Sequence, residues 1–198
     1  MALIVIDMQY DFMDESLEGK GALPVNGARA IETNVFGLVE TFPISQGVAT
    51  KDAHPEDHCS FKENGGQWPR HCVRGTKGAE IVWNLTYNGS EDDYYAFVWL
   101  KGGDKDVDAY GGFWDIEGNR SGLTEQLRWR GFKTLVLCGL AFDFCVGETA
   151  KQGVEDGFEV YIVEDATRAV FPDEYEKKKE ELIAAGVKFI QSDEFEAA

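Results

Sequence analysis

Thr134-Leu-Val-Leu-Cys-Gly-Leu-Ala-Phe-Asp-Phe-Cys-Val146 contains the pattern that decides the fold. It opens on an apolar run, Thr134 to Leu137, which is typical of a strand buried on both faces of a parallel sheet. A helical pattern follows from Gly147 to Asp156, so Cys145 lies at a strand-to-helix junction. The unpaired N–H groups at a helix start favour the thiolate, which makes Cys145 a candidate nucleophile. The alternative is a small buried hydrophobe, the usual state of a free cysteine.

The same type of strand recurs along the chain and is separated mostly by helical patterns. Apolar runs predict further strands at Ala2–Ile6, Gly47–Thr50, Tyr95–Leu100, Phe158–Val163 and Val187–Ile190. Helical spacing predicts helices within Val25–Phe42, from the N-cap candidate Ser121 to Gly131, and from about Pro172 to Ala185. Strands that alternate with helices predict an α/β fold, a three-layer α/β/α sandwich around a mainly parallel, six-stranded sheet.

Length, charge and cysteine usage limit the kind of protein. A chain of 198 residues can bury a substantial core, and we expect residues 1–198 to form one domain. Its least regular part, residues 55–94, is long enough for a functional loop region. The net charge of -17 opposes binding to nucleic acid and to anionic membranes. The opening run Ala2–Ile6 lacks a basic leader and the four cysteines form no CxxC pair, so we expect a cytoplasmic protein.

Three residues with reactive side chains follow separate apolar strands. Asp7 ends the first run, Lys101 ends the run from Tyr95, and Cys145 follows the strand that begins at Thr134. Because ligands of open parallel sheets bind beyond the carboxyl ends of the strands, we expect these side chains to converge. A carboxylate can accept the proton of a thiol, and an ammonium group stabilises both negative charges. The alternative is a structural ion pair or strand-end caps.

The three histidines of the chain lie in one short region that also carries an aspartate. They are His54, His58 and His71, and the carboxylate is Asp52. One carboxylate with two or three imidazoles suits Zn²⁺, Fe²⁺ or Mn²⁺ and leaves coordination positions open for a ligand. We therefore expect a metal site in the loop region at about residues 52–94.

A structural zinc site is a rival for the same region, since Cys59 and Cys72 neighbour His58 and His71. Neighbouring residues in an extended segment point to opposite sides, so both members of each pair would not easily face one ion.

Five segments of the chain carry a family resemblance when they are taken in order. They are Leu3-Ile-Val-Ile-Asp-Met-Gln-Tyr-Asp-Phe12, Lys51-Asp-Ala-His-Pro-Glu-Asp-His58, Trp68-Pro-Arg-His-Cys72, Lys101-Gly102 and Gly139-Leu-Ala-Phe-Asp-Phe-Cys-Val146. Together they resemble the isochorismatase-like cysteine hydrolases, over nearly the whole chain. The second and third segments are similar to the metal segments of the nicotinamidase branch, which its metal-free relatives lack.

The resemblance implies a catalytic role for several matched residues. Cys145 would attack the carboxamide carbon of nicotinamide, Asp7 would accept the proton and return it to ammonia, and Lys101 would support both charges. The N–H groups of Ala141 and Cys145 would form the oxyanion hole. The nucleophile loop of the family contains a cis peptide bond, which here would join Leu140 to Ala141.

The resemblance also implies a metal and a set of substrate contacts. Asp52, His54 and His71 would bind one divalent ion, most readily zinc, with iron and manganese as alternatives and His58 as a further candidate ligand. The ion would hold the pyridine nitrogen of the substrate. The expected substrate contacts are Phe12, Trp68, Tyr110 and Leu140, and ordinary core packing is the alternative for the aromatic members.

Two segments depart from the pattern of the family. Asp108-Ala-Tyr-Gly-Gly-Phe113 stands where many relatives carry Asp-Ser-Tyr-Ser-Gly-Phe, and Phe142 stands where threonine is common. Neither change removes a group that the reaction needs. We therefore expect a nicotinamidase of NAD salvage that also accepts pyrazinamide, with its oligomeric state, including a homo-oligomer, left open. The alternatives are an enzyme of the same fold that hydrolyses another small amide, and a non-catalytic metal-binding or redox module.

Overall fold

Six parallel strands form the centre of the structure, a computed structural model that describes residues 1–15, 19–86 and 94–195. The strands are β1 (Ala2–Ile6), β2 (Gly47–Asp52), β3 (Phe97–Lys101), β4 (Thr134–Leu140), β5 (Glu159–Arg168) and β6 (Lys188–Ile190). Their order across the sheet is β3-β2-β1-β4-β5-β6, and all the pairings between neighbours are parallel. The predicted six-stranded parallel sheet is confirmed.

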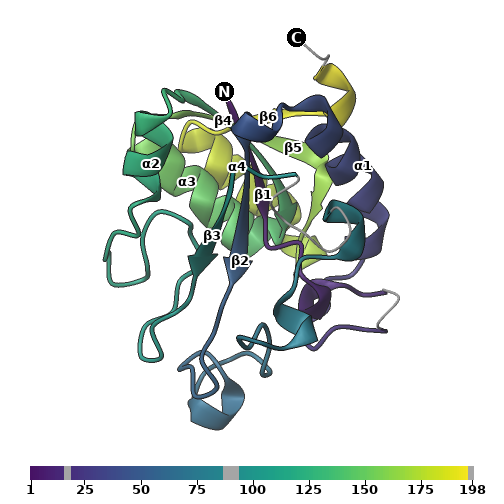
Figure 1. The fold of residues 1–198 in the computed structure, drawn as a ribbon, viewed down its shortest axis with the longest axis vertical. Coiled ribbons are helices and arrows are strands. Elements are labelled where there is room, and N and C mark those ends of the chain that lie inside the picture. Colours follow the sequence, from purple (N-terminus) through teal and green to yellow (C-terminus); the bar gives the residue numbers. More distant parts are fainter. Residues whose placement is uncertain (16–18, 87–93, 196–198) are drawn as a thin grey trace.

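Among the described residues, four α-helices cover the two faces of this sheet (Figure 1). They are α1 (Ala28–Thr41), α2 (Leu123–Trp129), α3 (Gly147–Glu155) and α4 (Tyr175–Ala184). The apolar side of α1 packs on one face, whereas α2, α3 and α4 pack on the other. This is the three-layer α/β/α sandwich that the alternating pattern predicts.

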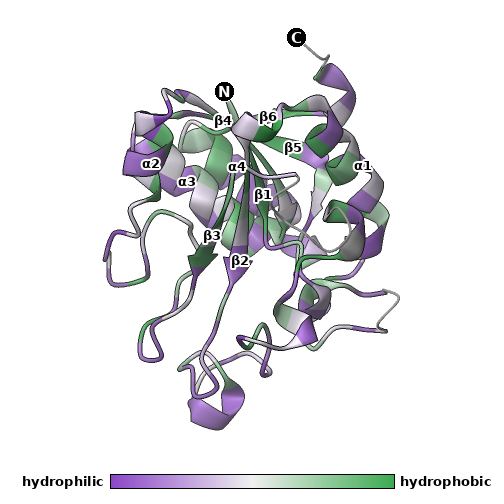
Figure 2. Cartoon of the chain, in the orientation of Figure 1, coloured by the Kyte–Doolittle hydropathy of each residue, from purple (hydrophilic) through white to green (hydrophobic). Residues whose placement is uncertain are grey.

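The first strand shows how an apolar run builds both layers of the core. All five residues of β1 are buried. Leu3 and Val5 pack with α1, and Ile4 and Ile6 pack with the opposite helices, because successive side chains of a strand point to opposite faces. Figure 2 shows apolar residues along the strands, while the Lys62–Asn64 turn at the bottom of the view is hydrophilic. No helix in the described part of the chain has the length and apolar composition needed to cross a membrane.

The order of the strands reverses between β1 and β4, the two central strands of the sheet. In open α/β sheets the ligand binds in the crevice beyond the carboxyl ends of the strands at such a point. β1 ends just before Asp7, β2 ends at Asp52, β3 ends at Lys101, and β4 leads into the turn with Cys145. The crevice therefore collects candidate residues from four strands.

The strand β5 extends well beyond the end that the apolar pattern indicates. We expect β5 to end at Val163, but it continues to Arg168. The extension pairs with β4 through Gly139↔Thr167 and Leu140↔Arg168, after a shift in register. Backbone hydrogen bonds maintain the strand there, although its polar side chains no longer show the pattern of a buried strand.

Candidate active site

Lys101 lies at the centre of a buried charged cluster. Its Nζ is 2.8 Å from Oδ2 of Asp7 and 3.3 Å from Sγ of Cys145, and it also contacts Oδ1 of Asp52. All four residues are buried, and the ligand atoms of Asp7, Asp52 and Cys145 lie within 4.8 Å of one another. The structure brings the three candidate catalytic residues together and adds Asp52 as a second partner of the lysine.

Asp7 is placed by a sharp turn of the backbone directly after β1. Its φ is 48°, a left-handed conformation that aspartate tolerates better than most residues. Its Oδ1 accepts a hydrogen bond of 2.7 Å from the hydroxyl of Thr50 on β2, and its Oδ2 faces Lys101. The two carboxylate oxygens are thus fixed by two different strands.

Cys145 is placed by a π-helical turn, Phe142–Val146, that continues into α3. Asp143 anchors this turn, because its carboxylate accepts hydrogen bonds of 2.9 and 2.8 Å from the N–H groups of Val170 and Phe171. The thiol therefore lies where a central strand meets a helix, and the loop after β5 supports the turn that holds it.

Burial and the ionic partners set the protonation of the cluster. Burial raises the pKa of Asp7, and the charge of Asp52 adds to the rise, although Lys101 opposes it. Burial also raises the pKa of the Cys145 thiol well above its ordinary value. Burial alone would lower the pKa of Lys101, but Asp52 and Asp7 outweigh it and hold the pKa well above its usual range. The resting cluster is a neutral thiol beside a charged lysine, with Asp7 as a stronger base than an ordinary aspartate.

Three metal-binding side chains converge next to this cluster. The ligand atoms of Asp52, His54 and His71 lie within 4.8 Å of one another. Nδ1 of His54 is 2.8 Å from the carbonyl oxygen of Gly102, and Nδ1 of His71 is 2.8 Å from that of Pro69. Because a carbonyl oxygen only accepts, each Nδ1 carries the proton and each Nε2 keeps its lone pair. One carboxylate and two imidazoles held in this way fit a divalent metal ion.

The orientation of His54 depends on a glycine after β3. Gly102 has a φ of 62°, and a Cβ on this residue would lie 2.4 Å from Cε1 of the His54 ring. Any side chain at this position would displace the imidazole. The Lys101-Gly102 pair therefore contributes to both parts of the site. Lys101 belongs to the charged cluster with Asp7 and Cys145, and Gly102 leaves room for the imidazole of His54 in the metal-binding group.

His58, the further candidate ligand, is buried beside the three-residue group. Its ring centroid is 4.1 Å from that of His54, and its Nδ1 is 2.8 Å from Oγ of Ser60. Its buried Nε2 has no hydrogen-bond partner among the described residues. An unpaired buried nitrogen is costly, so this atom also fits a metal ligand, although it is not one of the closely grouped atoms.

The rival Cys/His zinc site is not assembled in the described part of the chain. Neither Cys59 nor Cys72 belongs to a group of closely spaced ligand atoms there. Burial raises the pKa of both thiols, which disfavours the thiolate that zinc binds. The Asp52 group is the better candidate metal site.

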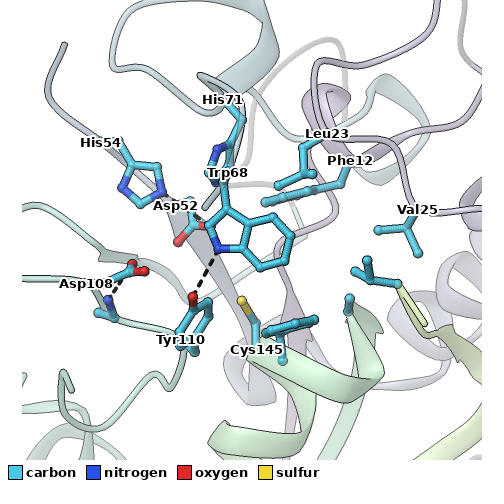
Figure 3. A pocket seen from close by; sticks show the side chains of 14 residues that line it. Phe12, Leu23, Val25, Asp52, His54, Trp68, His71, Asp108, Tyr110 and Cys145 are labelled. Atoms are coloured by element: carbon cyan, nitrogen blue, oxygen red, sulfur yellow. Dashed lines mark hydrogen bonds and ion pairs between the residues drawn. The ribbon is translucent and has the colours of Figure 1, made fainter. Parts of the chain in front are cut away.

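Both groups open onto one pocket, which holds about 450 Å³ of empty space with its mouth included (Figure 3). Figure 3 shows His54, His71 and Asp52 on one side and Phe12, Leu23 and Val25 on the other. The pocket is lined by Phe12, Leu23, Val25, Asp52, His54, Trp68, His71, Asp108, Ala109, Tyr110, Ala141, Phe144, Cys145 and Val170. A polar end, an aromatic wall and a nucleophile suit a small, flat ligand with a polar ring atom.

Of the four predicted substrate contacts, the structure places three at the pocket and one in the core. Phe12, Trp68 and Tyr110 line the pocket. Leu140 does not, because its side chain is fully buried in the core on the side of α1. The peptide bond between Leu140 and Ala141 is cis, as the resemblance implies, and Ala141 itself lines the pocket.

Sequence reasoning missed six of the lining residues, namely Leu23, Val25, Asp108, Ala109, Phe144 and Val170. The position of Phe144 next to Cys145 could have indicated its place, and Asp108 and Ala109 precede Tyr110 in a recognised segment. The remaining three carry no local signal, because only the paths of their loops bring them to the pocket.

Residues 1–194 match the sequence model of the isochorismatase domain, and the chain belongs to this family of hydrolases. Within the family it is similar to nicotinamidases. It is 34% identical over 195 residues to the nicotinamidase/pyrazinamidase of Mycobacterium tuberculosis, an alignment that covers 96% of this chain and 98% of that protein.

Two solved structures show the same likeness in three dimensions. PnC1 from L. infantum in complex with nicotinate has a TM-score of 0.88 and 36% identity, and the match covers 97% of this chain and 92% of that one. The pyrazinamidase of Pyrococcus horikoshii in complex with zinc has a TM-score of 0.82 and 41% identity, with 96% and 98% covered.

Proposed function

We propose that this protein is a nicotinamide amidohydrolase, which converts nicotinamide and water to nicotinate and ammonia in NAD salvage and also hydrolyses pyrazinamide. One observation carries the proposal. The thiol of Cys145, in contact with Lys101, and the Asp52, His54 and His71 group open onto the same aromatic pocket. The names of the relatives described above support the same substrate.

The polar end of the pocket orients the substrate. Asp52, His54 and His71, with His58 as a further candidate, would hold one divalent ion, zinc first and iron or manganese as alternatives. When bound, this ion supplies a Lewis acid for the pyridine nitrogen. Phe12 and Trp68 pack against the ring, so that the carboxamide faces Cys145.

The first half of the reaction forms a thioester. As Sγ of Cys145 bonds to the carboxamide carbon, the thiol proton passes to Asp7, whose raised pKa suits this role. The N–H groups of Ala141 and Cys145 stabilise the negative oxygen of the tetrahedral intermediate. The C–N bond then breaks, Asp7 returns the proton to the leaving nitrogen, and ammonia departs. Lys101 stays protonated and balances the charge on sulfur and carboxylate.

The second half consumes water. Its oxygen attacks the thioester carbon while Asp7 accepts one of its protons. The C–S bond breaks, the proton returns to the sulfur of Cys145, and nicotinic acid leaves and ionises to nicotinate in water. One amide and one water are used, and one carboxylic acid and one ammonia are formed.

Ammonia release from nicotinamide by the metal-loaded protein tests this proposal. We expect turnover in the wild type and none in Cys145→Ala or Asp7→Asn, each with unchanged far-UV circular dichroism. A protein that is inert toward nicotinamide but hydrolyses another small amide would show a different substrate. Inertness toward all amides, with a reversible disulfide between Cys138 and Cys145, would favour the redox module, although all four cysteines are free thiols here.

The proposed setting is the cytoplasm, with a small molecule as the partner and neither nucleic acid nor a membrane surface. The four free cysteines fit a reducing compartment, and the net charge of -17 would repel phosphate groups.

A further inference from the structure

Tyr110 joins two loops that face each other across the pocket. One loop carries Trp68 and His71, and the other follows β3. Nε2 of Gln67 and Nε1 of Trp68 both donate hydrogen bonds to the phenol oxygen of Tyr110, each at 3.0 Å. Figure 3 shows the bond from the indole, which crosses the front of the pocket.

The hydroxyl of Tyr110 accepts two hydrogen bonds in this arrangement. A phenol hydroxyl can both accept and donate hydrogen bonds. Gln67 and Trp68 both donate to the phenol oxygen, so the hydroxyl acts as the shared acceptor of two neighbouring side chains. Burial raises the pKa of Tyr110 and the charge of Asp108 adds to the rise, although the bonds from Trp68 and Gln67 oppose it, so the phenol stays protonated. We call these three residues, Gln67, Trp68 and Tyr110, the clasp.

The clasp determines how the indole of Trp68 faces the pocket. The backbone of Trp68 is held by its N–H to the carbonyl of Ser60 at 3.0 Å and by its carbonyl to the N–H of Lys62 at 2.8 Å. Its ring meets Phe144 edge-on, with centroids 5.0 Å apart, and this apolar contact does not engage the indole N–H. The bond to Tyr110 is the polar contact that fixes the ring.

We propose that Tyr110 is a positioning residue, whose hydroxyl holds Trp68 in the orientation that forms the aromatic wall of the substrate pocket. The inference rests on the proposed function in that the ligand used to measure it is nicotinamide. The hydroxyl points to Gln67 and Trp68, and the reacting cluster of Cys145, Asp7 and Lys101 is held by other contacts. Loss of the Tyr110 hydroxyl therefore weakens substrate binding and leaves the chemical step unchanged.

Steady-state kinetics of Tyr110→Phe, Trp68→Phe and the double variant test this role. Tyr110→Phe keeps the ring and removes only the hydroxyl, so we expect KM for nicotinamide to rise about tenfold while kcat stays within about twofold, as for the loss of one or two neutral hydrogen bonds. In the Trp68→Phe background the same change should raise KM by no more than about threefold, because the bond is already lost. Tyr161→Phe is the matched control, since its hydroxyl bonds to Glu159 and Lys188 on the far strands.

Fluorine NMR of protein labelled with 5-fluorotryptophan gives a readout that does not need turnover. The chain has 5 tryptophans, and the signal of Trp68 is the one missing from Trp68→Phe. We expect this signal to shift or broaden in Tyr110→Phe and to stay in place in Tyr161→Phe. An unchanged Trp68 signal, an unchanged KM, or equal effects of Tyr110→Phe in both backgrounds would overturn the proposal. A shifted signal in a protein that does not hydrolyse nicotinamide would support the clasp and reject the proposed function.

Discussion

Lys101 connects the two halves of the site at the scale of single residues. Its ammonium group contacts Asp7, the proposed base, and also Asp52, a candidate metal ligand. The sequence indicated each of these residues separately, because each follows a strand. It could not indicate their pairing, since the contact between Lys101 and Asp52 depends on the parallel register of β2 and β3.

The pKa of Asp7 makes a prediction about the pH dependence of catalysis. Asp7 must be ionised to accept the thiol proton, and burial raises its pKa above the ordinary value of about 3.9. Activity is therefore lost as the pH falls through this raised pKa. We expect the acid limb of kcat/KM to lie above the pH at which an ordinary aspartate titrates, where circular dichroism still shows folded protein. An acid limb at or below an ordinary aspartate pKa would contradict the assignment of Asp7 as the base.

The start of α1 shows what could not be predicted at the scale of secondary-structure elements. The helix begins after Gly27, which has no capping side chain. Instead, the carboxylate of Asp14, distant in sequence, accepts hydrogen bonds of 2.7 and 2.9 Å from the N–H groups of Gly27 and Arg29. The apolar spacing of α1 predicted the helix, but its cap comes from a loop. Ser121 is closer to expectation, since its Oγ accepts the N–H of Leu123 at the start of α2.

Replacing Asp14 with alanine should destabilise the protein by about 1 kcal/mol at pH 7, the usual cost of losing a helix cap. Partial burial alone would raise the pKa of Asp14, but the N–H groups of Arg29 and Gly27 outweigh it and lower the pKa. The stabilisation is therefore present above the unfolded pKa and is lost as the pH falls through the folded one. Urea unfolding at pH 7 and pH 3 measures the free energy of unfolding that Asp14→Ala loses at each pH. Glu40→Ala, on the exposed side of α1, is the control. An equal effect of Asp14→Ala at both pH values would exclude the charged cap.

Gly139 makes a prediction about the two central strands. It has a φ of 106°, and a Cβ on it would lie 2.1 Å from the carbonyl oxygen of Ile6 on β1. Gly139→Ala should lower the free energy of unfolding by at least about 3 kcal/mol, because alanine is strained at a positive φ and its Cβ would overpack against β1. Gly131 has a φ of 78° with no atom within 4 Å, so Gly131→Ala should cost only about 1 to 2 kcal/mol. Denaturant unfolding compares the two, and equal costs would show that β1 and β4 can separate without penalty.

At the scale of the whole molecule, the sequence predicted the architecture well because the strands are continuous apolar runs. The alternation of strands and helices was enough for the sandwich, and the strand ends located Asp7, Lys101 and Asp52. The apolar side of the pocket was not predictable, since Leu23, Val25 and Val170 come from loops that only the tertiary fold brings together. Resemblance, and not periodicity, supplied the expectation of the cis peptide bond.

Metal removal tests how the site contributes to the stability of the whole molecule. A metal ion that binds only the folded chain stabilises it by mass action, so zinc at about 100-fold above its Kd should raise Tm by roughly 5–10 °C over chelator-treated protein. Nicotinamide hydrolysis should disappear with the chelator and return with the metal. His71→Ala is the control, and calorimetry should show a much smaller shift in this variant. The same shift in both proteins would place the metal elsewhere.

The covalent intermediate on Cys145 is the most direct test of the proposed chemistry. Wild-type protein is mixed with nicotinamide, quenched in acid during turnover, and digested for mass spectrometry. We predict the mass of a nicotinoyl group on the peptide that contains Cys145, and its absence from Cys145→Ala. Turnover without this adduct, with hydrolysis that persists in Cys145→Ala, would contradict a mechanism in which the thiol is the nucleophile.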